Sequence, residues 1–194
     1  MRYLPNGKQM SEADAHTIHE IGIPSLVLME RAALQIVETM HKKNISTEKS
    51  LIVCGSGNNG GDGFAVARLL TEQGKHADVL FAGKEASLSE ECRCQKQIVE
   101  NMGISVFTEF PDEEYTVIID AVFGVGLCRE ITGHYKDVID WMNLQDAEKV
   151  AVDIPSGICA ATGKILGTAF RADLTVCMAC VKLDCELFPG KSYA

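Results

Sequence analysis

Three short stretches of the chain hold residues whose types and spacing could do chemistry. They are residues 54–63 (CGSGNNGGDG), residues 120–130 (DAVFGVGLCRE) and residues 153–157 (DIPSG). Each stretch directly follows an apolar run of the kind that forms a buried strand. Carboxylates such as Asp120 and Asp153 can transfer protons or stabilise a positive charge, and glycine lets the backbone approach a ligand closely. The three stretches therefore predict a ligand site that carries acid–base groups.

The glycine-rich string is similar to a phosphate-binding turn, but not to that of an ordinary dehydrogenase. Gly55, Gly57 and Gly60 satisfy the pattern G-x-G-x-x-G, and the N–H groups of the helix that follows favour an anion. An NAD-dependent dehydrogenase also needs an acid at the tip of its second strand, where this chain has Phe-Ala-Gly at residues 81–83. Asp62, inside the string, either caps the helix or would repel a pyrophosphate. The string is thus nucleotide-related without following the ordinary pattern.

The same stretches supply ligands for a cation. Asn59, Asp120 and Ser156 offer hard oxygen atoms, which suit an alkali or alkaline-earth ion better than zinc. The five histidines are scattered along the chain, and no pair of them lies near these residues. A strand-tip Asp can also be a simple turn or helix cap. Two strand-tip acids, Asp120 and Asp153, are expected to face the Asn-rich string of residues 54–63, which favours a ligand site over two simple caps.

The elements that must position these residues alternate between strand and helix. Apolar runs predict strands at residues 50–54, 77–82, 104–107, 115–119, 149–152 and 172–176. Helices are expected at residues 11–20, 25–43, 61–73, 89–102 and 134–142, with Ser11 and Ser25 opening the first two. This order predicts an α/β fold with a doubly wound, mainly parallel sheet and helices on both faces. The two N-terminal helices are expected to pack on the sheet or on a partner subunit.

Composition limits the possible functions. The chain of 194 residues predicts a single domain, residues 1–194. Its 18 basic and 27 acidic residues give a net charge of −9, which argues against nucleic acid as the main ligand. No apolar run reaches the roughly 18 residues of a membrane span, and the N-terminus has no signal-peptide core, so a cytoplasmic protein is expected. The eight cysteines are interpreted as reduced core residues, with a metal–thiolate site as the alternative.

Together the three stretches resemble the NAD(P)H-hydrate epimerase family, also called the YjeF N-terminal domain. The resemblance covers nearly the whole chain and also includes residues 22–25, 28–31, 162–163 and 189–190, with Lys182 and Tyr193. The chain departs from the family at Ala33, where glycine is frequent, and over residues 177–182, where the family is rich in Gly and Pro. The family continues beyond the position of Ala194, so a longer protein fused to a dehydratase stays open.

The resemblance implies a Rossmann-like fold, a homodimer and a bound potassium ion. It implies an isomerase that interconverts the R and S forms of NADHX and NADPHX, hydrated cofactors that an ADP- or ATP-dependent NAD(P)H-hydrate dehydratase restores. The implied potassium ligands are Asn59, Asp120 and Ser156. The implied substrate contacts are Asn58, Asn59, Gly60, Gly61, Asp62, Gly124, Val125, Gly126, Leu127, Cys128, Arg129, Glu130 and Asp153.

Asp153 is the expected catalytic residue. Epimerisation at a carbon that bears a hydroxyl beside a ring nitrogen can lose and regain water through an iminium-like cation. Such a reaction needs an acid and a base near the ring, and a carboxylate stabilises the cation. Two alternatives remain: a non-catalytic nucleotide-binding module, and an NAD(P)-dependent oxidoreductase. Asp153 favours an enzyme over the module, and the missing strand-tip acid counts against the oxidoreductase.

Overall fold

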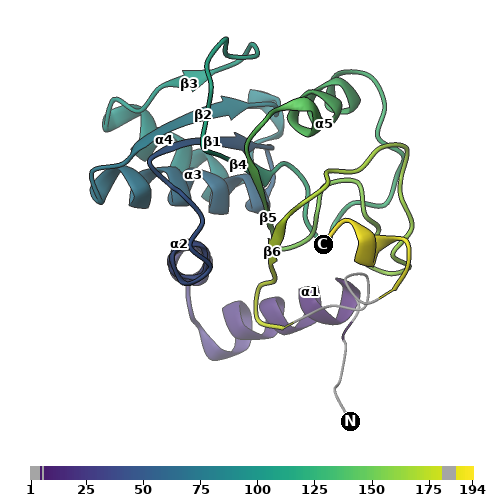
Figure 1. The fold of residues 1–194 in the computed structure, drawn as a ribbon. Helices are drawn as coiled ribbons and strands as arrows, with labels where there is room; N and C mark the ends of the chain where they lie inside the picture. The colour runs from purple at the N-terminus through teal and green to yellow at the C-terminus, as the bar shows by residue number, and fades with distance from the viewer. Residues whose placement is uncertain (1–4, 6, 181–186) are drawn as a thin grey trace.

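A computed structural model describes residues 5, 7–180 and 187–194, and it contains a six-stranded parallel sheet (Figure 1). The order across the sheet is β3-β2-β1-β4-β5-β6, and every neighbouring pair is parallel. The chain therefore starts in the middle of the sheet and winds outwards twice, as predicted for a doubly wound α/β fold. The strands are β1 (Lys49–Cys54), β2 (His76–Phe81), β3 (Val106–Phe107), β4 (Val117–Ala121), β5 (Glu148–Val152) and β6 (Leu174–Val176).

Helices cover both faces of the sheet. One face packs against a core built with α2, α3 and α4, and the other face packs against α5. The main helices are α1 (Gly7–His16), α2 (Ser25–Lys42), α3 (Asn58–Glu72), α4 (Glu90–Asn101) and α5 (His134–Leu144). A π-helical turn, Thr17–Ile21, continues α1, and short 3-10 turns lie at Glu85–Ser87 and Gly190–Ser192. None of the described helices is long and apolar enough to cross a membrane.

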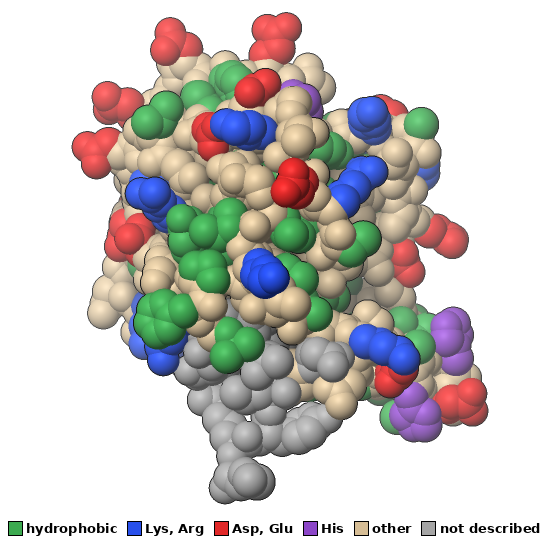
Figure 2. All heavy atoms as spheres, turned by 90° about the vertical axis from the view of Figure 1, so that its right-hand side faces the viewer, with side chains coloured by type: hydrophobic (Ala, Val, Ile, Leu, Met, Phe, Trp, Pro, Cys, Tyr) green, Lys and Arg blue, Asp and Glu red, His purple; other side chains and the backbone are tan. Residues whose placement is uncertain are grey.

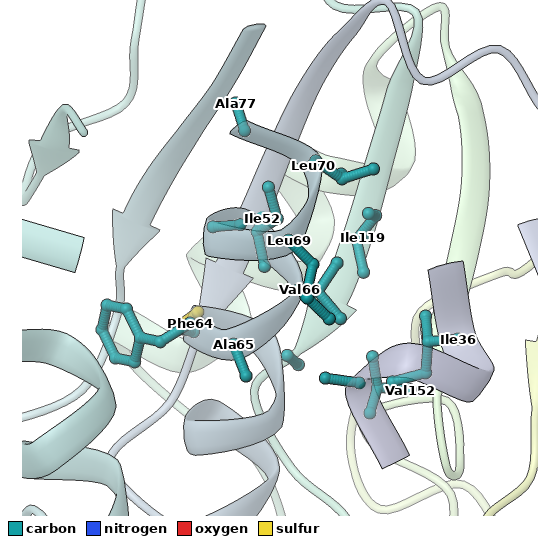
Figure 3. Close-up of a cluster of buried hydrophobic side chains, with 14 of the residues drawn as sticks. Ile36, Ile52, Phe64, Ala65, Val66, Leu69, Leu70, Ala77, Ile119 and Val152 are labelled. Carbon is teal, nitrogen blue, oxygen red and sulfur yellow. The ribbon is translucent and has the colours of Figure 1, made fainter. Parts of the chain in front are cut away.

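Helix α3 lies at the centre of the larger core (Figure 3). Its side chains Phe64, Val66 and Leu70 are fully buried against Ile52 of β1 and Ile119 of β4. Burying a side chain of this size contributes about 1.5–3 kcal/mol. The helix begins immediately after β1, so the same packing that stabilises the core also fixes the glycine-rich string at its start.

The prediction for the two N-terminal helices is confirmed in part. Helix α2 packs on the core through Ala33, Ile36 and Met40, as its apolar spacing indicates. Helix α1 begins at Gly7 instead of Ser11, because the Ser11 hydroxyl donates to the Gly7 carbonyl (3.1 Å) from inside the helix. Ser25 likewise does not cap α2. Pro24 holds the cap position, and no side chain caps this helix end.

Several other boundaries differ from the prediction. Helix α3 begins at Asn58, three residues before the expected start, so most of the glycine-rich string is helical. Strand β3 has only two residues, and β4 is shifted to Val117–Ala121. Asp120 therefore lies within β4 instead of beyond it. The predicted order of helices and strands is otherwise confirmed.

The structure also shows the surroundings of Glu30 and Arg31 in α2 and of the cysteines. The Arg68 guanidinium of α3 donates to Glu30 of α2 and to Glu72, so Glu30 belongs to an ion-pair network between two helices. Arg31 is exposed. Seven cysteines lie in the described part of the chain, and no disulfide joins any two of them. Cys185 lies outside the described residues.

Candidate active site

The candidate site lies at the carboxyl edge of the sheet, where the arrows of β1 and β2 end (Figure 1). Figure 2 faces this side of the molecule. Hydrophobic side chains gather in the middle of this face with Lys and Arg side chains among them, and many of the Asp and Glu side chains stand at its margin. A protein with a net charge of −9 therefore presents cationic groups on the side where doubly wound folds bind ligands.

The glycines of the string allow close packing at the start of α3. A Cβ atom on Gly60 would lie 2.0 Å from the Gly55 carbonyl oxygen, and one on Gly63 would lie 2.6 Å from the Ala121 Cβ. These distances are far below van der Waals contact, so the helix can approach β1 and β4 only because these residues lack side chains. Gly57 caps the helix and has open space around it. The string thus packs a helix start tightly against the sheet and leaves its end accessible.

Asp120 and Ser156 form a buried polar cluster. The Ser156 hydroxyl and backbone N–H each donate to the Asp120 carboxylate at 2.7 Å, and the Val122 N–H donates at 3.2 Å. The Phe123 N–H donates to the Ser156 hydroxyl oxygen at 2.9 Å. Both Asp120 and Ser156 are fully buried. Burial raises the pKa of Asp120 from 3.8 to about 6, although the donated hydrogen bonds act in the opposite direction.

Asn59 extends this cluster to the glycine-rich string. A Cβ on Gly124 would lie 3.2 Å from Asn59 Oδ1, so the Asn59 side chain contacts the loop next to Phe123. The Asn59 side-chain nitrogen is buried and has no hydrogen-bond partner among the described residues. The predicted cation ligands thus lie around one loop, and the Phe123 carbonyl adds another oxygen there. Within the described chain, no cationic side chain bonds the Asp120 carboxylate. This set of oxygens fits a cation.

Asp153 occupies a strained position directly after β5. Its φ is +70°, a conformation that non-glycine residues rarely adopt and that costs about 1–3 kcal/mol. Its backbone N–H donates to the Val176 carbonyl at 2.9 Å, and its carboxylate accepts the Met178 N–H at 3.1 Å. The end of β6 therefore holds the backbone of Asp153, and the segment after β6 holds its carboxylate. Met178 also lines the neighbouring cavity.

A cavity of about 430 Å³ lies against Met178, whose N–H donates to Asp153, and this volume is within the usual range for small-molecule sites. Asn58 and Asp62, one helical turn apart on α3, line it together with residues after β6. Helices α1 and α2 close the other side with Asp14, Arg31 and several further side chains. No signal in the sequence indicated this contribution of α1, because its polar residues are typical of a solvated surface.

The remaining predicted residues vary in exposure. Gly60 and Gly61 are buried in α3, Gly124 is half-buried beside Asn59, and Val125 and Leu127 are half-buried. Gly126, Cys128, Arg129 and Glu130 are exposed. Among the described residues, no hydrogen bond or ion pair joins the side chains of Cys128, Arg129 and Glu130 to Asp153 or Asn59. Of the family positions, the Gly190 N–H donates to the Gly163 carbonyl (2.9 Å), and Lys182 lies outside the described residues.

A second polar cluster lies at the opposite edge of the sheet. His76, Asp78 and Glu113 offer three possible metal-ligating atoms within 4.8 Å of one another. The Lys49 ammonium already contacts Glu113 at 2.8 Å, and the His76 ring lies 2.9 Å from Asp78. This cluster stands at the amino ends of the strands, away from the predicted cation ligands. We interpret it as a polar network between strand starts.

The end of β2 differs from that of a dehydrogenase. In dinucleotide-binding folds the cofactor ribose lies between the glycine-rich turn and an acid at this strand tip. Here a Cβ on Gly83 would lie 2.8 Å from the Ser56 backbone nitrogen, and the Ser89 N–H donates to the Ser56 carbonyl at 2.9 Å. The chain after β2 therefore packs on the turn, and residues 81–83 place no acid at this strand tip.

Comparison with known proteins identifies a family. Residues 25–183 match the family model described as YjeF-related protein N-terminus. The chain is 41% identical over 191 residues to a protein of Oenococcus oeni, covering 97% of this chain and 91% of the relative. It is 43% identical over 193 residues to one of Limosilactobacillus reuteri (strain DSM 20016), covering 98% and 91%. Both relatives carry the name NAD(P)H-hydrate epimerase.

A solved structure has the same fold. The crystal structure of yeast ynu0 superposes with a TM-score of 0.82 at 20% identity, covering 96% of this chain and 83% of that one. The family model spans well over half of the chain, and the two bacterial relatives are similar over nearly all of it. The chain therefore belongs to the family of proteins related to the YjeF N-terminus.

Proposed function

We infer that the chain is an NAD(P)H-hydrate epimerase, an isomerase of nicotinamide nucleotide repair. The observation that carries this conclusion is the sequence identity of 41–43%, over nearly the whole chain, to relatives of that name. The site geometry supports it, because a carboxylate held in a strained conformation stands beside a cavity next to a helix start. The reaction moves no electrons between molecules, so the site needs only proton transfer and charge stabilisation.

We propose that Asp153 is the catalytic carboxylate. Its position between β5 and the segment after β6 is fixed by two hydrogen bonds, so it can face the nicotinamide ring without reorganising. The accessible N–H groups at the start of α3 would hold phosphate oxygens of the substrate. The loop of residues 124–130 would close over the same ligand, as expected from the position of Gly124 beside Asn59.

An NAD(P)-dependent oxidoreductase fits less well, because the chain after β2 packs on the glycine-rich turn and places no acid at this strand tip. A binding module without catalysis would not need a strained carboxylate. Strain of about 1–3 kcal/mol at Asp153 is typical of functional sites and has no other evident use here.

We propose potassium as the bound cation, held by Asn59, Asp120 and Ser156 with the Phe123 carbonyl. One carboxylate among neutral oxygens favours a monovalent ion, since calcium sites usually gather several carboxylates. The cation would neutralise the buried Asp120 carboxylate and fix the loop against the string. The described residues provide no positive side chain that does this instead.

This assignment predicts how stability changes with pH and potassium. The pKa of folded Asp120 is raised by burial to about 6, so the native state binds more protons than the unfolded state between pH ~4 and ~6. The free energy of unfolding should therefore fall as pH rises through that range in tetramethylammonium chloride. Potassium chloride at equal ionic strength should restore stability at pH 7.5 more than at pH 4.5.

Thermal unfolding of two variants provides the control. Asp120→Asn should lose the potassium-dependent increase in Tm, whereas Asp78→Asn, which changes an equally buried carboxylate at the other edge of the sheet, should keep it. An equal potassium effect in wild type and Asp120→Asn would contradict the assignment.

We also propose a homodimer in the cytoplasm that works with a dehydratase. Ile21, Val27 and Leu34 are large apolar side chains with 46–61% of their surface exposed, and the last two lie seven residues apart on one face of α2. A second copy covering this face would bury them. The seven described cysteines form no disulfide with one another, which fits a reducing compartment. An ADP- or ATP-dependent NAD(P)H-hydrate dehydratase would consume the S form that the epimerase supplies.

The function is tested by mixing R-NADHX with the chain, potassium and a dehydratase that accepts only the S form. Recovery of NADH from the R form should then be much faster than with the dehydratase alone. Recovery at the spontaneous rate, with the protein shown to be folded, would overturn the proposed activity. A separate absorbance assay for hydride transfer to small carbonyl compounds tests the oxidoreductase alternative, and we expect no turnover.

A further inference from the structure

Asp62 has no structural partner in the described part of the chain. It does not cap α3, because Gly57 is the cap residue and no side chain bonds there. None of the hydrogen bonds or ion pairs among residues 5, 7–180 and 187–194 reaches its carboxyl group. A carboxyl group that neither caps a helix nor pairs with a cation is left for a ligand.

The side chain of Asp62 faces the cavity beside Asp153. It lines that cavity together with Asn58, four residues earlier on the same helix face, and with Met178. The Met178 N–H is the group that donates to the Asp153 carboxylate at 3.1 Å. Asp62 of α3 therefore lines the cavity directly, while Asp153 at the end of β5 is joined to the cavity wall through Met178 and lies close enough for its charge to act on Asp62.

Charged and titratable groups surround Asp62 on every side. Burial raises the pKa of Asp62 well above its ordinary range, and the charges of Asp153 and then Asp14 raise it further. Arg31 of α2 also lines the cavity, and the thiols of Cys54 in β1 and Cys92 in α4 respond to the charge of Asp62. An acid in this setting keeps its proton at a pH where most carboxyl groups have lost theirs.

We propose that Asp62 is the proton donor that releases the hydroxyl group of the substrate. This proposal rests on the epimerase function. The Asp62 carboxyl passes its proton to the hydroxyl oxygen on carbon six, the C–O bond breaks, and water leaves. The lone pair of the ring nitrogen forms the C=N bond of an iminium ion, whose positive charge lies near Asp153.

The return step restores every group. A water molecule attacks carbon six from the other face and forms the new C–O bond, while the C=N electron pair returns to the ring nitrogen. The proton lost by that water goes to the pair of carboxyl groups, which ends with one proton as it began. No oxidant, reductant or second substrate is consumed. Asp62 and Asp153 thus have different roles, one as acid and the other as the anion that stabilises the cation.

The test compares Asp62→Asn, Asp62→Glu and, as a control at an exposed position away from the cavity, Asp112→Asn with wild type. For Asp62→Asn we expect kcat for epimerisation to fall about 100- to 10,000-fold, the usual size of an acid–base contribution. Exchange of the carbon-six hydroxyl with ¹⁸O-labelled water should fall in parallel, because both need C–O cleavage. The dissociation constant for NADPH, used as a probe of binding, should change only a few-fold, and Tm at pH 8 should not decrease.

The other variants distinguish an acid from a structural residue. Asp62→Glu should restore part of the activity with a shifted basic limb of the pH–rate profile, and Asp112→Asn should stay within a few-fold of wild type. Activity of Asp62→Asn within about three-fold of wild type would overturn the proposal. A parallel loss of NADPH binding or Tm, or an equal loss in Asp112→Asn, would also overturn it. An inactive wild-type protein would instead refute the epimerase function itself.

Discussion

Replacing Asp153 with Asn should reduce kcat for epimerisation about 100- to 10,000-fold. The substitution removes the negative charge that would stabilise the iminium-like cation, and it changes the shape of the side chain very little. Asn tolerates a positive φ better than most residues, so the conformation at +70° should persist. The amide oxygen of the introduced asparagine can still accept the Met178 N–H.

The stability of Asp153→Asn shows whether a loss of activity comes from lost catalysis or from unfolding. The free energy of unfolding, measured with urea, should stay within about 1 kcal/mol of wild type because the asparagine can keep the hydrogen bond from the Met178 N–H. Asp112→Asn, at an exposed position outside the three stretches, is the matched control and should keep full activity. Turnover of Asp153→Asn within ten-fold of wild type would show that another group supplies the charge.

Replacing Gly60 with Ala should destabilise the protein by about 3 kcal/mol, near the upper end of the usual cost of overpacking. The new Cβ would lie 2.0 Å from the Gly55 carbonyl oxygen and 2.7 Å from its carbon. Both contacts are with backbone, so no side chain can rotate away. The start of α3 would have to move away from β1, which would also displace Asn58, Asn59 and Asp62.

Gly57→Ala is the matched control for this prediction. Gly57 belongs to the same string, its φ is −87°, and an added Cβ would meet nothing within 4 Å. The free energy of unfolding of Gly57→Ala should therefore stay within about 1 kcal/mol of wild type. Equal stabilities of the two variants in urea would mean that the close approach between residues 55 and 60 does not constrain the helix.

The fold could be predicted from the sequence because the patterns that indicate its strands and helices are local. Buried parallel strands are short apolar runs, and a glycine follows or ends most of the helices, so the order of elements could be predicted. The predicted helix boundaries were wrong where one residue type is common both inside helices and at their ends. Ser11 resembles a helix cap but lies inside α1, and the glycines before Phe64 resemble a loop but form the first turns of α3.

The sequence indicated which side chains form the candidate site, but it did not indicate the backbone groups that orient them. The strand-tip positions of Asp120 and Asp153 and the short distance from Asp153 to Ser156 along the chain predicted a common location. The Phe123 and Met178 N–H groups that orient them carry no sequence signal, since every residue except proline has an N–H. The sequence also could not predict that Asp62 has no hydrogen bond or ion pair within the described chain, because Asp is common near helix starts as a cap.

The central claim is tested most directly by following the approach to equilibrium from both sides without any dehydratase. Pure R-NADHX and pure S-NADHX are incubated separately with the protein and potassium at neutral pH, and the two forms are separated by chromatography over time. The epimerase function predicts that both mixtures converge on the same ratio much faster than without protein, and that Asp153→Asn fails to accelerate this. Interconversion at the spontaneous rate in both directions, with folded protein that binds NADPH, would contradict it and favour a binding module.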